Sequence, residues 1–279
     1  MSICNPSVLR KFLDDLGIYP KKGLSQNFLI DGNIIRKIIE KANVNPGDAV
    51  LEIGPGPGSL TQAMLEAGAR VIAVEKDPVL AQALNRLQTP SQQLLVFCED
   101  ILSFSLDKEI PKMMKEDKKV KVIANLPYHL TTPIIAQLVE HPDLFSSLTL
   151  MVQEEVARRF IALPGTADYS SFTIFLRFHT YPLYAFTVSK NCFYPAPKVN
   201  SAIVTLQLHE PPLTGAEADS FFRLTRTAFE HRRKMMRASL KHLYSPKHIE
   251  DALQSIGKNP LARPETLSLE DFLELHKLL

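Results

Sequence analysis

The chain has few cysteines. Only Cys4, Cys98 and Cys192 occur among its 279 residues, and they stand far apart in the sequence. They form neither a Cys-x-x-Cys pair nor a cluster with the spacing of metal ligands, so the sequence predicts no disulfide framework and no metal site. Reduced, buried thiols in a cytoplasmic protein are the simplest interpretation.

Long apolar runs are also absent. No uncharged stretch of the sequence approaches the roughly 20 residues that a helix needs to cross a bilayer. The N-terminal stretch MSICNPSVLRKFLDDLG mixes charged and apolar residues and lacks the continuous apolar core of a signal peptide. We therefore expect a soluble, cytoplasmic protein that does not associate with membranes.

The chain carries little net charge. Its formal charge is +2 at pH 7, so any affinity for nucleic acid must come from local clusters of basic residues. With 45% hydrophobic and 22% charged residues, the composition is typical of a globular protein with a full core. We expect a monomer.

Short apolar runs alternate with helical patterns over the first two thirds of the chain. The runs expected to form strands are 49–54, 70–77, 94–100, 121–127 and 148–153. Strands that alternate with helices of this length predict an α/β fold with a parallel, doubly wound sheet. Two later segments, 180–190 and 198–210, have no helix between them and predict an antiparallel hairpin at the sheet edge.

The character of the sequence changes at EPPLTG, residues 210–215. Every later segment has the periodicity of a helix, so we expect a small all-α domain at the C-terminus. The paired prolines indicate the boundary. The predicted domains are therefore residues 1–210, which would bind a small ligand, and residues 211–279.

A loop rich in glycine and proline, within LEIGPGPGSL, follows the first of these strands. Gly54 and Gly56 allow a sharp turn and a close approach of the backbone to a ligand. A dinucleotide fingerprint would require a third glycine at position 59, which is serine here. Pro55 and Pro57 have no amide N–H to offer a pyrophosphate, so a nucleoside without phosphate suits this loop better.

Acidic residues close the next two strands. Glu75 is placed to accept hydrogen bonds from ribose hydroxyls, and Asp100 is placed to accept one from an adenine amino group. A single acid at a strand end is usually only solvated. Because the carboxyl ends of parallel strands meet at one edge of the sheet, the two acids and the glycine loop together predict an adenosine pocket. In this pattern the chain resembles the class I methyltransferases, whose cofactor, S-adenosylmethionine, carries no phosphate.

A fourth strand ends in Asn125-Leu126-Pro127-Tyr128. An exocyclic amine on an aromatic base is a poor nucleophile, because its lone pair is delocalised into the ring. The Asn125 carboxamide oxygen and the Leu126 carbonyl could accept its two N–H groups, and the Tyr128 ring offers a face for a base taken out of its stack. Positioning and electrostatics would then provide the catalysis.

The tetrapeptide NLPY resembles the corresponding motif of the rRNA adenine N6,N6-dimethyltransferases. Four further segments of the chain resemble motifs of this family: KKGLSQNFLID (21–31), EIGPGPGSLT (52–61), VQEEVARRF (152–160) and FYPAPKVNSAIV (193–204). The resemblance implies that Asn27 and Leu29 line the cofactor pocket and that Gly54 is the main contact in the glycine loop. Asn125, beside the proposed methyl donor, is expected to line the same pocket. It also implies that Phe193 forms a second stacking wall opposite Tyr128.

A basic segment, residues 223–241, has seven Lys or Arg residues and one Glu, a net charge of +6 over nineteen residues. A solvated helix face is the ordinary explanation of such a run. In the family that the chain resembles, the helical domain grips rRNA, so the resemblance assigns phosphate contacts to Arg232, Arg233, Lys234 and Arg237. A complete helical domain of this kind is more similar to the small-subunit enzymes than to the macrolide-resistance methylases of the large subunit.

The resemblance implies dimethylation of two adjacent adenosines in the 3′-terminal hairpin loop of small-subunit rRNA, on an immature small ribosomal subunit, with a role in its biogenesis. Two alternatives remain open: a large-subunit rRNA methylase of the resistance type, and a mainly non-enzymatic assembly or RNA-binding factor. A DNA adenine or glutamine amide methylase would show NPPY or DPPY and a target-recognition domain. Ser59 argues against a nicotinamide oxidoreductase, because the dinucleotide fingerprint requires glycine at that position.

Overall fold

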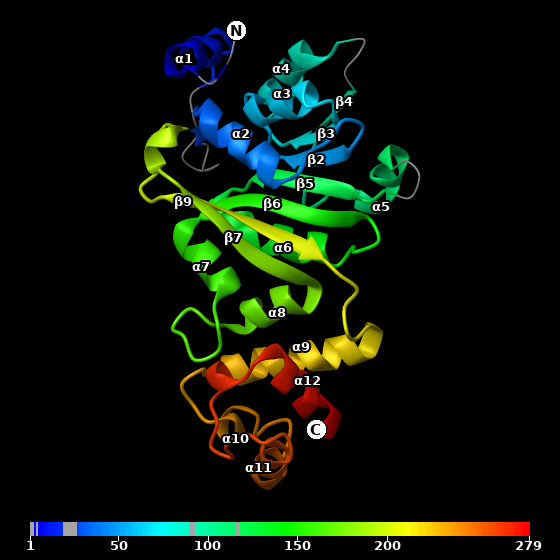
Figure 1. Ribbon diagram of the computed structural model, residues 1–279, viewed down its shortest axis with the longest axis vertical. Coiled ribbons are helices and arrows are strands. Elements are labelled where there is room, and N and C mark those ends of the chain that lie inside the picture. The colour runs from blue at the N-terminus through cyan, green and yellow to red at the C-terminus, as the bar shows by residue number, and fades with distance from the viewer. Residues whose placement is uncertain (1–2, 4, 19–26, 90–92, 115–117) are drawn as a thin grey trace. The chain divides into compact units, whose positions relative to one another are not determined.

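The computed structural model describes residues 3, 5–18, 27–89, 93–114 and 118–279 (Figure 1). It divides into two compact units. The sheet unit comprises the described residues of Met1–Ala157 with Leu183–Leu208, and the helical unit comprises Arg158–Pro182 with His209–Leu279. The boundary expected after residue 210 lies two residues beyond the end of the sheet unit. The segment 158–182, which precedes that boundary in the sequence, belongs to the helical unit.

A seven-stranded sheet with the order β4-β3-β2-β5-β6-β9-β7 forms the centre of the sheet unit (Figure 1). The strands are β2 (Ala49–Ile53), β3 (Arg70–Glu75), β4 (Leu94–Cys98), β5 (Val120–Asn125), β6 (Phe145–Gln153), β7 (Thr180–Val188) and β9 (Ser201–Leu208). The first five are parallel, and β9 runs antiparallel to β6 with β7 as its other neighbour. The predicted α/β class and the antiparallel edge are confirmed.

Two short strands form a separate ladder. β1 (Phe28–Leu29) pairs antiparallel with β8 (Phe193–Tyr194), so Leu29 lies opposite Phe193 and Phe28 opposite Tyr194. The sequence did not predict this pairing, since two residues are too few to show a periodicity. The ladder brings the segment after Asn27 against the loop that precedes β9.

Side-chain caps fix where several helices of the sheet unit begin. Asp31 accepts hydrogen bonds from the amides of Asn33 and Ile34, and Asp77 caps the helix that starts with Pro78. The helices of this unit are α1 (Pro6–Asp15), α2 (Gly32–Lys41), α3 (Ser59–Glu66), α4 (Pro78–Ala83), α5 (Leu106–Glu109) and α6 (Thr131–Val139). Helix α7 (Glu154–Ile161) continues from β6.

The core of the sheet unit explains why its strands read as continuous apolar runs. Every residue of β2 and β3 is buried, because helices cover both faces of a parallel sheet. On one face, α2 and α3 lie side by side and pack Ile38 and Met64 against Val50 and Val71 (Figure 1). No helix in the described part of the chain is long and apolar enough to cross a membrane.

The helical unit has its own aromatic core. Its helices are α8 (Ser171–His179), α9 (Gly215–Phe229), α10 (Met236–Ser239), α11 (Pro246–Ser255) and α12 (Leu269–Leu278). Phe178, Phe221 and Phe272 are fully buried, with Phe178 and Phe221 stacked at a centroid distance of 5.2 Å. Ser268 forms a capping box with Asp271 at the start of α12. The sequence predicted the helices after residue 210 but missed α8.

His179 in this core gives a prediction about stability. Its ring is 6% exposed, lies among Phe175, Phe178 and Phe222, and has no hydrogen-bond partner on either nitrogen. Burial, together with the nearby His209, lowers the pKa of His179 from 6.5 to about 4. The unfolded chain therefore binds a proton between these values while the folded chain does not, and the free energy of unfolding falls as the pH is lowered through that window.

We expect a loss of about 2 kcal/mol between pH 7 and pH 5 from this group, measured by urea unfolding followed by circular dichroism. His179→Leu should remove this part of the pH dependence. His242, which is exposed, is the matched control, since His242→Leu should leave the pH dependence as in the wild type. An equal pH dependence in the wild type and His179→Leu would contradict the assignment.

Candidate active site

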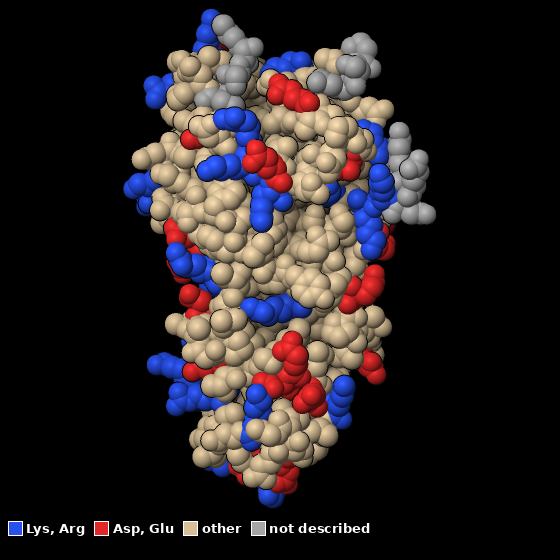
Figure 2. Space-filling view, viewed as in Figure 1, with Lys and Arg blue, Asp and Glu red and all other residues tan. Residues whose placement is uncertain are grey.

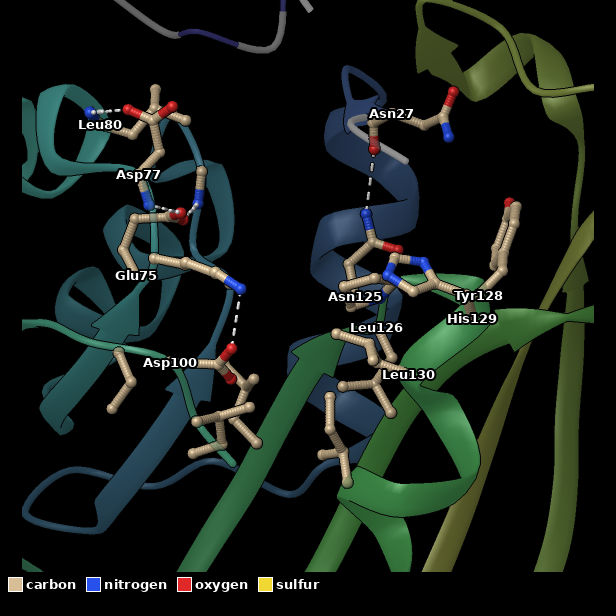
Figure 3. A pocket seen from close by; sticks show the side chains of 18 of the residues that line it. Asn27, Glu75, Asp77, Leu80, Asp100, Asn125, Leu126, Tyr128, His129 and Leu130 are labelled. Carbon is tan, nitrogen blue, oxygen red and sulfur yellow. Dashed lines mark hydrogen bonds and ion pairs between the residues drawn. The ribbon is translucent and has the colours of Figure 1, made fainter. Parts of the chain in front are cut away.

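A cavity lies at the carboxyl ends of β2, β3 and β5, and most of the predicted site residues line it (Figure 3). These are Asn27, Gly54, Gly56, Glu75, Asp100, Asn125, Leu126 and Tyr128. Figure 3 shows Glu75, Asp77 and Asp100 on one side of the cavity and Asn27, Asn125 and Tyr128 on the other. The parallel sheet thus brings the residues of the predicted adenosine pocket and the Asn125–Tyr128 segment to one cavity.

The glycine loop turns by means of backbone conformations that favour glycine. Gly54 and Gly56 have φ values of +65° and +56°, and a Cβ on Gly56 would lie 3.0 Å from the Phe28 ring. The three loop amides are already used: Gly54 donates to Val74 O, Gly56 to Glu75 Oε2 and Gly58 to Pro55 O. With prolines at 55 and 57, residues 54–58 have no amide left for a phosphate, which favours a phosphate-free ligand.

Among the described residues, Glu75 is one of two buried acids that line the cavity, the other being Asp77. The side chain of Glu75 is 7% exposed, and its two oxygens accept 2.9 Å hydrogen bonds from the amides of Gly56 and Asp77. Burial raises the pKa of Glu75, and these amide hydrogen bonds oppose that rise. The carboxyl therefore ties the glycine loop to the end of β3, and each oxygen retains a lone pair for a hydroxyl of the ligand.

Asp100 lies at the same end of the cavity but is less available than the sequence suggested. Its Oδ2 forms a 2.8 Å ion pair with Lys76 Nζ, and its Oδ1 accepts from the Leu102 amide at 3.0 Å. The hydrogen bond from Lys76 is the main reason that the pKa of Asp100 is lowered. An adenine amino group would share this carboxylate with an exposed lysine, a neighbour that the sequence gave no reason to expect.

Asn125 closes β5, and one hydrogen bond sets how its carboxamide is turned. Its Nδ2 donates to the main-chain oxygen of Asn27 at 3.1 Å. The carboxamide oxygen consequently lies on the side of Tyr128 and His129, as Figure 3 shows. An acceptor thus faces the region where the sequence predicts the target amine. Asn27 and Asn125, which were predicted separately from two distant segments, are thus in direct contact.

The turn after Asn125 is held at several points. The Leu126 amide donates to Met151 O at 3.1 Å, and the Thr131 hydroxyl donates to Pro127 O at 3.3 Å. Residues Tyr128–Leu130 form a 3₁₀ turn that leads into α6. The Tyr128 hydroxyl lies 3.1 Å from Ser201 Oγ. Tyr128 therefore presents its ring at the cavity from a turn whose backbone is fixed to β6.

Leu29 and Phe193 do not line the cavity. They are 5% and 3% exposed, lie opposite one another in the β1–β8 ladder, and pack in the core with α2. Phe193 thus has no ring face open to a base in this structure, and its predicted stacking role stays a prediction. Phe28 lines the cavity instead, since neighbouring residues of a strand point to opposite sides.

Sequence reasoning also missed the apolar part of the wall. Ile53, Leu80, Ile101, Leu130 and Ile134 all line the cavity. They look like ordinary core residues in the sequence, and no motif distinguishes them. Among the described residues, no group of three or more His, Cys, Asp or Glu side chains could hold a metal ion.

The basic segment of the helical unit does not present all its charges in the same way. Arg232 forms a 3.1 Å ion pair with Glu265 and donates to Ala167 O, and Arg237 pairs with Glu250 at 2.5 Å. Arg233 and Lys234 are exposed, and within the described part of the chain neither forms an ion pair. On the face seen in Figure 2, basic and acidic side chains are interspersed.

Comparisons with known proteins show the family of the chain. The family model described as "Ribosomal RNA adenine dimethylase" matches residues 19–279. A protein of Protochlamydia amoebophila called "Ribosomal RNA small subunit methyltransferase A" is 67% identical over 276 residues, covering 99% of this chain and 97% of the relative. A protein of the same name from Chlamydia muridarum is 47% identical and covers 97% of this chain and 96% of the relative.

Solved structures show the same fold. A dimethyladenosine transferase from Plasmodium falciparum superposes with a TM-score of 0.75 at 29% identity, covering 89% of this chain and 95% of that one. The 23S rRNA methyltransferase ErmE superposes with a TM-score of 0.70 at 28% identity, covering 91% and 99%. The fold is that of an S-adenosylmethionine-dependent methyltransferase. The chain belongs to the ribosomal RNA adenine dimethylase family.

Proposed function

We propose that the cavity binds S-adenosylmethionine and that the chain transfers methyl groups to the N6 amines of two adjacent adenosines in the 3′-terminal hairpin loop of small-subunit rRNA. The names of the relatives from Protochlamydia and Chlamydia support the choice of subunit. Modification of an immature subunit would give the protein a place in small-subunit biogenesis.

The residues of the cavity fit this cofactor. The buried Glu75 carboxylate at the end of β3 suits ribose hydroxyls, and Asp100 and Ile101 lie where an adenine ring would rest. The glycine loop approaches without side chains, and its used amides agree with a ligand that has no phosphate. Asn27, next to Asn125, lies at the opposite side of the cavity, where the methyl-bearing end would face the substrate.

The orientation of Asn125 is the observation that carries the proposal. Because its Nδ2 is bonded to Asn27 O, its Oδ1 is the atom left to accept an N–H of the target amine. That hydrogen bond directs the nitrogen lone pair away from the ring. S-adenosylmethionine bound here would supply an electrophilic methyl group: the new N–C bond would form as the C–S bond breaks, and the amine would then release a proton to water. Tyr128 holds the base by stacking.

The choice of substrate can be tested directly. Small ribosomal subunits from a strain that lacks the modification, and naked large-subunit rRNA, would each be incubated with the protein and S-adenosylmethionine. Digested nucleosides would be analysed by mass spectrometry. We expect dimethyladenosine from the small subunit. Product from the large-subunit rRNA alone would support the resistance-type alternative, and no product from either would support an assembly factor that only binds.

The exposed pair Arg233 and Lys234 is proposed to contact rRNA phosphates. Changing both to glutamine should reduce the slope of log affinity against log salt by about 1.5, since each phosphate contact contributes about 0.7–0.9. Filter binding to small subunits over a range of salt concentrations measures the slope. Lys247 and Lys277 are exposed cations of the same unit outside the basic segment, and changing both to glutamine is the control. Equal slopes for the two double variants would contradict the contact.

A further inference from the structure

We propose that Ser201 is a positioning residue of the methyl-transfer site, acting through Tyr128. This inference rests on the proposed function. Ser201 is the first residue of β9, and its side chain does not line the cavity. It is not one of the residues proposed to contact the cofactor or the base. It acts indirectly, through the hydroxyl of Tyr128.

The contact joins the side chain of Tyr128 to a buried strand. The Tyr128 hydroxyl and Ser201 Oγ are 3.1 Å apart, within hydrogen-bonding distance. Ser201 is 0% exposed and lies opposite Gln153 in the antiparallel register of β9 and β6. Just before it, Asn200 accepts from the Glu154 amide through its main-chain oxygen and from the Lys190 amide through its side chain. The serine is therefore anchored by the sheet and by the loop that leads into it.

Among the described residues, the contact with Ser201 is the only hydrogen bond of the Tyr128 side chain. The ring is half-buried, and none of the aromatic rings in the described residues stacks on it. The hydrogen bonds of the turn act on its backbone and do not involve the ring. A hydrogen bond at the far end of the ring, made to a buried strand, holds the phenol oxygen in place. Because a phenol O–H prefers to lie in the plane of its ring, the same bond favours one ring plane. That plane is the surface on which the base would stack.

A fixed plane matters most for the second methyl transfer. The unmodified amine offers two N–H groups to the Asn125 side chain and the Leu126 carbonyl, whereas the monomethylated amine offers one. With one of these hydrogen bonds gone, the orientation of the base depends more on stacking. Loss of the Ser201 contact should therefore slow the second transfer more than the first, and monomethyladenosine should accumulate.

The test is a double-mutant cycle of Ser201→Ala and Tyr128→Phe, two changes that remove the same hydrogen bond from either side. Single-turnover rates and the ratio of monomethyl- to dimethyladenosine would be measured on hypomethylated small subunits. We expect each single variant to lower the rate of the second transfer about fivefold, the worth of one hydrogen bond, and the double variant to lower it no further. The affinity for S-adenosylmethionine should stay within about twofold of the wild type.

Thr149→Val is the matched control. Thr149 is a buried hydroxyl residue of β6 in register with Thr205 of β9, away from the cavity. Loss of the Thr149 hydroxyl should leave the ratio of monomethyl- to dimethyladenosine unchanged.

Two results would overturn the proposal. One is an unchanged product ratio in Ser201→Ala. The other is an equal loss of the rate of the second transfer when Ser201→Ala is made in the wild type and in Tyr128→Phe. If Ser201→Ala does not fold, Tyr128→Phe alone tests the bond. Absence of methyl transfer by the wild type would instead contradict the proposed function.

Discussion

Replacing Asn125 with alanine is expected to lower the rate of methyl transfer by about 10²–10³-fold while S-adenosylmethionine still binds. The change removes the carboxamide oxygen that faces the amine site and leaves the glycine loop and Glu75 untouched. Single-turnover transfer to hypomethylated small subunits measures the rate, and calorimetry measures the affinity for the cofactor. A weakening of cofactor binding by more than about tenfold would mean that Asn125 mainly serves the cofactor and not the amine.

Asn85 provides the control for this change. It is an exposed asparagine of the same unit, and it does not line the cavity. Asn85→Ala should transfer methyl groups at the wild-type rate. A second variant, Asn125→Asp, keeps the shape and an acceptor oxygen toward the amine but replaces the donor to Asn27 O with a second, negatively charged acceptor. It should retain more activity than Asn125→Ala only if the acceptor alone matters; equal loss would show that the bond to Asn27 is required to orient it.

Replacing Glu75 with alanine is expected to weaken S-adenosylmethionine binding by about 10- to 100-fold, or about 1–3 kcal/mol. Two causes act together. The ribose loses its acceptor, and the buried amides of Gly56 and Asp77 lose the carboxylate that holds the glycine loop against β3. Calorimetry or equilibrium dialysis with the cofactor measures the change. The melting temperature should fall as well, because two buried amides are left without a partner.

Glu75→Gln separates these two causes. The amide oxygen of glutamine can still accept from one of the two backbone amides, so part of the loop geometry is retained. We expect an affinity between those of the wild type and Glu75→Ala. Glu40 is an exposed glutamate of α2 that serves as the control, and Glu40→Ala should bind normally. An affinity of Glu75→Ala within about twofold of the wild type would exclude Glu75 from the cofactor site.

Much of this site could be predicted from the sequence because parallel strands impose a simple geometry. Gly54, Glu75, Asp100 and Asn125 all follow or close successive apolar runs, and the carboxyl ends of such strands meet at one edge of the sheet. Asp31 and Pro78 likewise show where helices begin, since capping residues act locally. Features that depend only on the neighbours of a residue along the chain could therefore be predicted from the sequence.

Contacts between segments that lie far apart in the sequence could not be predicted. The burial of Leu29 and Phe193 depends on a ladder of two residues in each strand, which has no sequence pattern. The ion pairs of Arg232 with Glu265 and of Arg237 with Glu250 depend on how the helical unit folds, so a charge count could not separate these arginines from Arg233. The buried Glu52, whose pKa burial raises to about 8, likewise reads as part of an ordinary strand.

The central claim is that one cavity holds the methyl donor and presents it to the amine site at Asn125. A crystal structure of the protein with S-adenosylmethionine would test it most directly, through the distance between the transferable methyl carbon and Asn125 Oδ1. We expect the ribose at Glu75 and a distance of about 5 Å or less, which leaves room for an amine nitrogen in contact with both. A cofactor bound outside this cavity, or a methyl group directed away from Asn125, would contradict the claim.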